Sequence, residues 1–201
     1  MKHIKDYDVY LLEKKIDISD YPNISSLGLV AKSSNRNSVN TKQLAIFDFK
    51  TNETMAYIEI RNLIDRNVFE IERASAEKGW GPLIYDYALM FSYPKPVAPS
   101  KTIKPSAINV WKYYYELRPD VIKQEMGVKD ESYSDKYRNH IMDDMLLTDD
   151  NLTYLNCYYS LKPSTEFLDL MEKGNILLKN SGMIPSQVFN YGNKHFKNSY
   201  S

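Results

Sequence analysis

Four runs rich in strand-forming residues lie between residues 27 and 75 and predict β-strands. They are Leu27–Lys32, Gln43–Phe49, Met55–Arg61 and Val68–Ser75. The last three are joined by short links, which is typical of an antiparallel meander and not of alternating strands and helices. The polar stretch Ser33–Lys42 predicts a loop between the first two runs.

A short glycine turn and a helix are predicted directly after the fourth run. Gly79-Trp80-Gly81 interrupts the strand pattern, and Pro82 suits the first turn of a helix, where its missing N–H costs nothing. The apolar residues that follow recur at helical spacing and leave Asp86 on the opposite side; they are Leu83, Ile84, Tyr87, Ala88, Met90 and Phe91. A helix N-terminus carries unpaired N–H groups and a positive dipole end, so this turn is a candidate anion site.

The second half of the chain gives a second set of expected elements. The prolines between Tyr93 and Pro105 require a mostly extended segment, with at best a short strand near Lys101–Lys104. Ser106–Arg118 predicts a helix whose apolar stripe consists of Ala107, Val110, Trp111, Tyr114 and Leu117. Further elements are expected as a helical turn in Asp120–Met126, a helix after Ser134, a strand at Leu152–Leu161 and a last helix from a Ser164 cap to Lys173.

The 201 residues suit one domain with an ordinary core and a small appendage. We expect a single α+β domain over residues 1–178, with its core at about 27–161, and a polar C-terminal extension over 179–201. The expected sheet is mixed but mainly antiparallel, with helices flanking it.

Three kinds of glycine loop bind phosphates in front of a helix, and two of them do not fit this turn. The dinucleotide fingerprint needs a third glycine where Ile84 stands, and the ATP-type loop needs a Gly-Lys-Ser/Thr sequence that is absent. The third kind is the pyrophosphate loop Gln/Arg-x-x-Gly-x-Gly/Ala, which Ala76-Glu77-Lys78-Gly79-Trp80-Gly81 resembles except for Ala76 at its first position.

That loop belongs to the GNAT superfamily of N-acetyltransferases, and the resemblance extends over roughly residues 27–160. The segments Gly-Trp-Gly-Pro-Leu-Ile-Tyr-Asp and Ser-Ala-x-x-Val-Trp-x-Tyr-Tyr are similar to a divergent, often phage-encoded branch of the superfamily. The resemblance implies a GNAT-like fold, acetyl-CoA as the cofactor and an amine as the acceptor, either a small molecule or a protein.

The resemblance also assigns residues to the cofactor. The turn would hold the pyrophosphate of acetyl-CoA through Lys78, Gly79, Trp80, Gly81, Pro82 and Leu83. The fourth strand would bond the pantetheine arm as an added strand through Ile71, Arg73, Ala74 and Ser75. One N–H of that strand would face the thioester oxygen.

Catalysis by direct attack needs a base for the ammonium of the acceptor and an acid for the leaving thiolate. Glu72 and Glu70 on the fourth strand are the candidate bases, with Glu59 as a weaker third, and each has the alternative of facing solvent. Trp111 stands where relatives often carry the acidic tyrosine, so Tyr114 or Tyr115 is the candidate acid. Packing in the core is the alternative for these tyrosines.

Composition excludes some classes of function and leaves others open. Net charge is zero, so no overall charge favours nucleic acid. Cys157 is the only cysteine, no apolar run reaches the length of a membrane span, and no histidine lies in a metal-ligand motif. We therefore expect a cytoplasmic protein, or a virion-associated one if it is phage-encoded, with no metal.

Two other functions remain open besides transfer of an acetyl group. One is a catalytically silent GNAT-like module that serves as a structural or interaction protein, for instance in a phage particle or against a host protein through its C-terminal tail. Ala76 and Trp111 favour that alternative. The other is transfer of a longer acyl chain.

Overall fold

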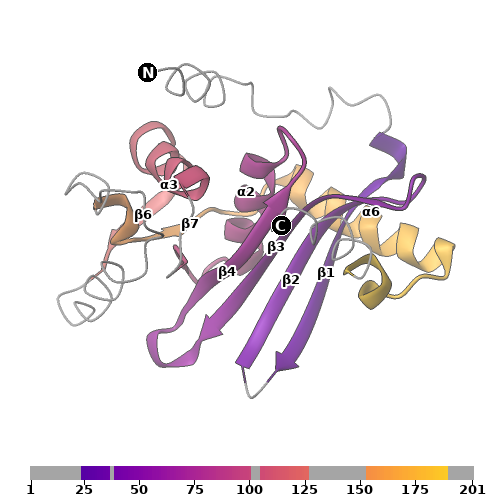
Figure 1. Cartoon of the computed structure of the whole chain (residues 1–201), viewed down its shortest axis with the longest axis horizontal. Coiled ribbons are helices and arrows are strands. Elements are labelled where there is room, and N and C mark those ends of the chain that lie inside the picture. Colours follow the sequence, from indigo (N-terminus) through magenta and orange to yellow (C-terminus); the bar gives the residue numbers. More distant parts are fainter. Residues whose placement is uncertain (1–23, 37–38, 101–104, 127–152, 190–201) are drawn as a thin grey trace.

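The computed structural model describes residues 24–36, 39–100, 105–126 and 153–189. Within these residues, seven strands form one sheet in the order β1-β2-β3-β4-β5-β7-β6, and helices pack against it (Figure 1). The expected α+β class with a mainly antiparallel sheet is confirmed, because β4 and β5 are the parallel neighbours in that order. The strands are β1 Leu27–Arg36, β2 Val39–Asp48, β3 Glu53–Leu63, β4 Val68–Ala76, β5 Val97–Ala98, β6 Ile122–Glu125 and β7 Cys157–Ser160. The α-helices are α2 Gly81–Ser92, α3 Pro105–Leu117 and α6 Thr165–Ser181, with single 3-10 turns at η2 Ile24–Ser26 and η3 Ile64–Arg66.

The first four strands form the predicted meander, and they are longer than the sequence pattern indicated. Leu27 pairs with Asp48 at one end of the β1–β2 ladder, and Arg36 pairs with Val39 at the other. The loop expected over Ser33–Lys42 is therefore wrong, because both strands continue through it. Backbone hydrogen bonds hold the ladder, and they tolerate polar side chains wherever those side chains reach water.

Alternation along these strands separates the sheet into two different faces. One face is apolar, and Leu44, Ile58 and Ile60 on it lie in the main core beneath α2 and α3. The opposite face carries a smaller apolar cluster that includes Phe47 and Tyr57, together with charged residues of β3 and β4. Both faces thus bury side chains, but only the face beneath α2 and α3 is uniformly apolar.

The second half of the sheet is built from short strands and differs from expectation. Ile122–Glu125 is strand β6 and not a helical turn, because it pairs with β7 from Ile122–Ser160 to Glu125–Cys157. Strand β7 occupies only Cys157–Ser160 of the expected Leu152–Leu161 strand, and residues 153–155 are helical. The strand expected near Lys101–Lys104 and the helix after Ser134 lie outside the described residues.

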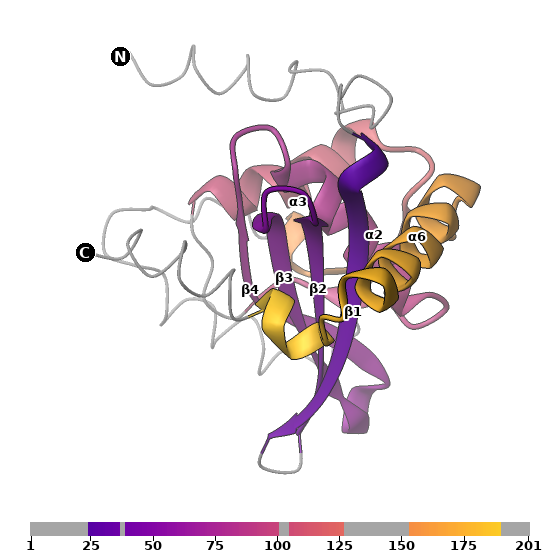
Figure 2. The same ribbon diagram turned by 90° about the vertical axis from the view of Figure 1, so that its right-hand side faces the viewer.

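Helix α6 runs beside β1, as Figure 2 shows, and extends further than predicted. Ser164 caps it as expected, since its hydroxyl accepts a hydrogen bond from the N–H of Phe167 at 3.2 Å. Gly174 does not end the helix but lies inside it, where an added Cβ would stand 2.2 Å from the carbonyl oxygen of Leu29. The glycine therefore permits close contact between helix and strand, and the helix ends at Ser181 before Gly182.

The residues after α6 also contribute to the fold. Residues 185–189 are helical, and Val188 and Phe189 are buried in the cluster with Tyr57. The boundary expected after residue 178 thus falls within α6, and the described part of the expected extension packs onto the sheet. No helix among the described residues is long and apolar enough to cross a membrane.

Candidate functional site

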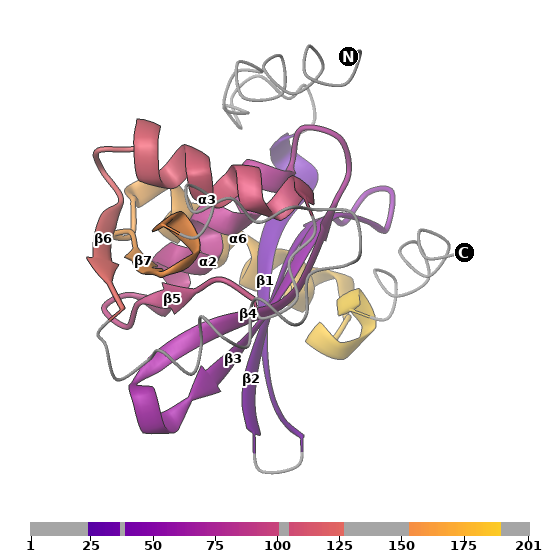
Figure 3. The ribbon, with the colours of Figure 1, turned by 60° about the vertical axis from the view of Figure 1, so that its left-hand side comes forward.

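Strand β4 has two neighbours over its first residues and one over the rest. Its parallel pairing with β5 consists of Phe69–Val97 and Glu70–Ala98. From Ile71 to Ala76 its ladder continues on the β3 side, and no described strand pairs with its other edge. A register shift opposite Glu59 and Ile60 lies where the β5 pairing stops. Among the described residues, the second half of β4 therefore has one edge without a strand partner, and α2 packs next to this strand (Figure 3).

The glycine turn lies at the end of this open edge. Gly79 has a φ of +89°, a backbone conformation that favours glycine, and Trp80 is buried in the core. The Trp80 N–H donates to the carbonyl of Glu77 at 3.0 Å, so it is engaged within the turn. Helix α2 begins at Gly81 with Pro82 in its first turn and no side-chain cap. The backbone N–H groups of Gly81 and Leu83 lie in the first turn, where a helix offers no acceptor of its own. They are therefore the candidate donors to a bound anion.

The two candidate bases of β4 come together at one arginine of β3. Arg61 donates to Glu70 at 2.8 Å and lies 3.4 Å from Glu72. Glu70 is buried, whereas the side chain of Glu72 is 36% exposed. Of the two carboxylates, Glu72 is the one that solvent or a ligand reaches more easily.

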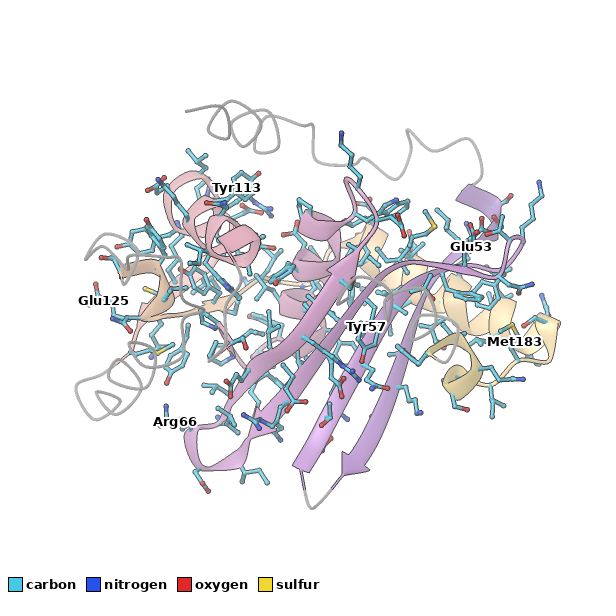
Figure 4. The ribbon with its side chains drawn as sticks, viewed as in Figure 1. Glu53, Tyr57, Arg66, Tyr113, Glu125 and Met183 are labelled. Carbon is cyan, nitrogen blue, oxygen red and sulfur yellow. The ribbon has the colours of Figure 1, made fainter. Side chains whose placement is uncertain are left out.

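A second group of polar residues lies beside this one on the same face of the sheet, where Figure 4 labels Tyr57. The Tyr57 hydroxyl donates to Glu59 at 2.6 Å, Arg73 also donates to Glu59, and Gln43 donates to the Tyr57 oxygen at 3.2 Å. Burial raises the pKa of Glu59, but the hydrogen bonds from Tyr57 and Arg73 outweigh it, so this pKa lies below its ordinary value. Glu59 is thus a carboxylate held in its charged form.

Tyr114 does not face the open edge of β4. It is fully buried, and its hydroxyl donates to Asp86 at 2.7 Å. Burial and the negative charge of Asp86 raise the pKa of Tyr114 well above its ordinary value. Its role as the acid stays a prediction, and this geometry counts against it. Tyr115 is half-buried against Tyr154, which leaves it as the more accessible of the two candidates.

Asp86, predicted to lie opposite the apolar residues of α2, is not exposed. Asp86 is buried between the helices and forms two contacts of 3.1 Å with Nη1 of Arg118. Arg118 also donates to Asp120 through Nε at 2.8 Å and Nη2 at 2.7 Å. Helix α2 is apolar nearly all round, which is typical of a buried helix, and an acid within it needs a cation. An acidic residue in an apolar helix could thus have identified Asp86 as a buried, paired carboxylate, but it does not identify Arg118 as the partner.

The expected stripe of α3 is correct in its centre and wrong at its end. Trp111 and Tyr114 are buried together, and Trp111 packs on Tyr85 of α2 and on Tyr159 of β7. Leu117 is 60% exposed, and Ile108 is buried in the stripe instead. Trp111 is therefore a residue of the hydrophobic core.

The remaining reactive groups show no further catalytic arrangement in the described ranges. Cys157 is buried, and burial raises the pKa of its thiol, so it lacks the features of a nucleophile. Within residues 24–36, 39–100, 105–126 and 153–189, no three His, Cys, Asp or Glu side chains cluster as metal ligands.

Comparison with known proteins identified no relative of this chain. No protein-family model matches the chain, and searches of curated proteins and of solved structures found no significant match. Function therefore has to be argued from the site.

Proposed function

We propose that this chain is an acetyl-CoA-dependent N-acetyltransferase of the GNAT superfamily. One observation supports it most: the edge of β4 from Ile71 to Ala76 lacks a described strand partner and leads into a glycine turn and a helix N-terminus. A pantetheine arm carries amide groups that pair with such an edge like an added strand. A pyrophosphate suits the N–H groups and the dipole of the helix behind it.

The order of elements around the opening fits the same proposal. An antiparallel meander precedes the turn, and a short strand and a second helix follow α2. This is the order that the resemblance of the sequence implies. In this proposal the cofactor lies along β4 and ends at the N-terminus of α2.

Transfer would proceed by direct attack of a primary amine on the thioester carbonyl. A base removes the proton of the ammonium, the new C–N bond forms, and the C–S bond breaks to release the thiolate of CoA. Glu72 is the preferred base, because it lies at the register shift where β5 ends and is the more exposed of the two carboxylates at Arg61. The backbone N–H groups of β4 would stabilise the oxyanion.

A calorimetric titration of the full chain with acetyl-CoA tests the proposal, with Gly81→Asp as the discriminating variant. The variant puts a negative charge where the pyrophosphate would lie. Aspartate is favourable in the first turn of a helix, and Gly81 does not have a positive φ, so the variant should fold normally.

Asn175→Asp adds the same charge on the exposed side of α6 and serves as the control. We expect binding by the parent and by Asn175→Asp, and none by Gly81→Asp. Absence of binding by the parent chain, or equal binding by Gly81→Asp, would contradict the cofactor assignment.

A catalytically silent GNAT-like module is a second candidate, and one observation favours it. Each carboxylate considered as a base has a cationic partner: Arg61 for Glu70 and Glu72, and Arg73 for Glu59. Such pairing suits a structural role as well as catalysis. Binding of acetyl-CoA without acetylation of any amine in a broad panel would support this candidate.

A further inference from the structure

Strand β4 contains one residue more than the stretch of β3 that lies opposite it. Ile60 pairs with Ile71, and the next pair along the ladder is Glu59 with Arg73. Glu72 lies between these two pairs as the extra residue, which makes this point a β-bulge. Because side chains of a strand alternate between faces, an extra residue changes the face toward which all later side chains point.

The ion pairs around the bulge show this change of face. Glu59 and Arg61 are two residues apart on β3, so their side chains share one face of the sheet. Arg61 lies 3.4 Å from Glu72, and Arg73 donates to Glu59. Two consecutive residues of β4 thus meet the charged face, and the next one, Ala74, packs on the apolar core on the other face.

A ladder without the bulge would place the same charges unfavourably. If the register of the first half of the ladder continued, Glu59 would lie opposite Glu72, and like charges directly opposite each other destabilise a sheet. Ile58 would lie opposite Arg73. Ile58 is fully buried in the main core, so this register would bring an unpaired guanidinium into apolar surroundings. The sequence of β4 therefore favours the shifted register.

The bulge also determines which backbone groups lie along the edge of β4 that has no described strand partner. Successive residues of a strand direct their N–H and C=O groups to opposite edges. A shift by one residue therefore exchanges the set that faces β3 with the set that faces away from it. A ligand that pairs with the second half of β4 would meet different donors and acceptors in the two registers.

We propose that Arg73 is a positioning residue for the cofactor. Its guanidinium keeps residue 73 on the charged face against Glu59, holds the bulge at Glu72 and so sets the backbone groups that β4 offers to acetyl-CoA. The identity of the ligand rests on the proposed function, whereas the register does not depend on any ligand. The choice is between two pairings of the same strands, so an ion pair that contributes little to overall stability is sufficient.

Two double variants that share Glu59→Lys test this role. Combined with Arg73→Val, the change favours the unshifted register, because the new lysine would lie opposite Glu72 and the new valine would suit the apolar face beside Ile58. Combined with Arg73→Glu, it restores a pair of opposite charges in the observed register and serves as the matched control.

Cross-strand NMR contacts of residue 59 measure the register of the full chain without a ligand. They should lead to residue 73 in the parent and in Glu59→Lys/Arg73→Glu, and to residue 72 in Glu59→Lys/Arg73→Val. Contacts to residue 73 in the valine variant would overturn the proposal. Loss of those contacts in the charge-swapped control would overturn it as well, whether or not the valine variant folds.

Calorimetric titration with acetyl-CoA measures the consequence for the ligand. Affinity should fall about tenfold in the valine variant, which corresponds to about two lost hydrogen bonds, and stay within about twofold of the parent in the control. The valine variant exchanges a negative for a positive charge and loses one positive charge, so it is more positive than the parent. That change alone would favour the anionic cofactor, and a loss of affinity therefore reports on the backbone.

The two measurements separate this inference from the proposed function. Parent-like affinity in a valine variant whose register has changed would overturn the role of Arg73 in cofactor binding. Absence of binding by the parent chain would contradict the proposed function instead, and the NMR contacts would still decide whether Arg73 holds the bulge.

Discussion

Charged residues are buried in two regions of the structure. One is the sheet face that carries the charged residues of β3 and β4, and the other lies between helices α2 and α3. On the face, Glu59 is buried but the side chain of its partner Arg73 is 48% exposed. Between the helices, Asp86 is 2% and Arg118 is 9% exposed, and Tyr114 closes the group with a hydrogen bond of 2.7 Å. The same kind of ion pair thus lies half in water in one region and almost wholly in protein in the other.

The difference in exposure indicates that the two ion pairs have different roles in stability. An ion pair that water reaches contributes little to stability and is easily rearranged by a ligand. A buried pair has a large desolvation cost, so removal of one partner leaves an uncompensated charge inside the protein. We therefore interpret Asp86–Arg118 as the ion pair that fixes α3 against α2. The ion pairs of Glu59 and Glu72 on β3 and β4 are the ones that a ligand can rearrange.

The largest expected effect is that of Arg118→Met. The variant keeps an apolar side chain of similar length but leaves Asp86 buried without its cation. Unfolding free energy should fall by about 3–5 kcal/mol in urea titrations. The double variant with Asp86→Asn should regain part of the loss, because the uncompensated charge is gone. A loss below about 1 kcal/mol in Arg118→Met would remove the distinction between the two regions.

Tyr114→Phe should have a smaller effect in the same region. It retains the ring packed on Trp111 and deletes the hydroxyl that donates to Asp86. Loss of a hydrogen bond to a charged group predicts a decrease of about 1.5–3 kcal/mol in the free energy of unfolding. Tyr113→Phe is the control, because the Tyr113 ring also lies near Arg118, while Tyr114 supplies the hydroxyl that donates to Asp86. Equal stability of the parent and Tyr114→Phe would show that the contact does not bear on folding.

Arg73→Met is the variant that corresponds to Arg118→Met on the sheet face formed by β3 and β4. Tyr57 continues to donate to Glu59, and water replaces the guanidinium, so the loss in unfolding free energy should be about 1 kcal/mol. Urea titrations beside Arg118→Met make the comparison direct. If Arg73→Met destabilises the protein as much as Arg118→Met does, exposure is not what separates the two pairs.

The smallest effect is a dependence on pH from Glu59. Its pKa in the folded protein lies below the ordinary value of 4.5, so its charged form stabilises the fold above that pH. This contribution is lost as the pH falls through the lowered pKa. The parent should exceed Glu59→Gln in stability at neutral pH, and the difference should shrink below 4.5. A difference that grows on acidification would reverse the sign of the assigned shift.

The sequence allowed the first half of the sheet to be predicted far better than the second, for a physical reason. Apolar residues alternate in Met55–Arg61 because one face of this strand lies on the uniformly apolar core while the other carries Glu59 and Arg61, and that signal is local. Ile122–Glu125 is a strand only through its pairing with Cys157–Ser160, which no local pattern reveals. Gly174 resembles a helix stop in the sequence, yet it lies within α6 because Leu29 leaves no space for a side chain.

In the candidate site, too, features with a local sequence signal were predictable and features set by long-range contacts were not. The glycine turn and the helix behind it were predictable, because Gly79, Gly81 and Pro82 have distinct backbone preferences. The pairing of Asp86 with Arg118 was not, since it joins the middle of one helix to the residue that follows another. Charged partners far apart along the chain are set by packing, and a single sequence does not show which cation an acid will meet.

We propose that acetyl-CoA lies along the second half of β4 and ends at the glycine turn. Backbone hydrogen exchange of the full chain, with and without saturating acetyl-CoA, measures this directly, because a ligand that pairs with β4 slows exchange of the amides it engages. We predict slower exchange in residues 72–76 and 79–83 and no change in β2, which is already paired on both sides. Unchanged exchange in residues 72–76 and 79–83 with acetyl-CoA present would contradict the account.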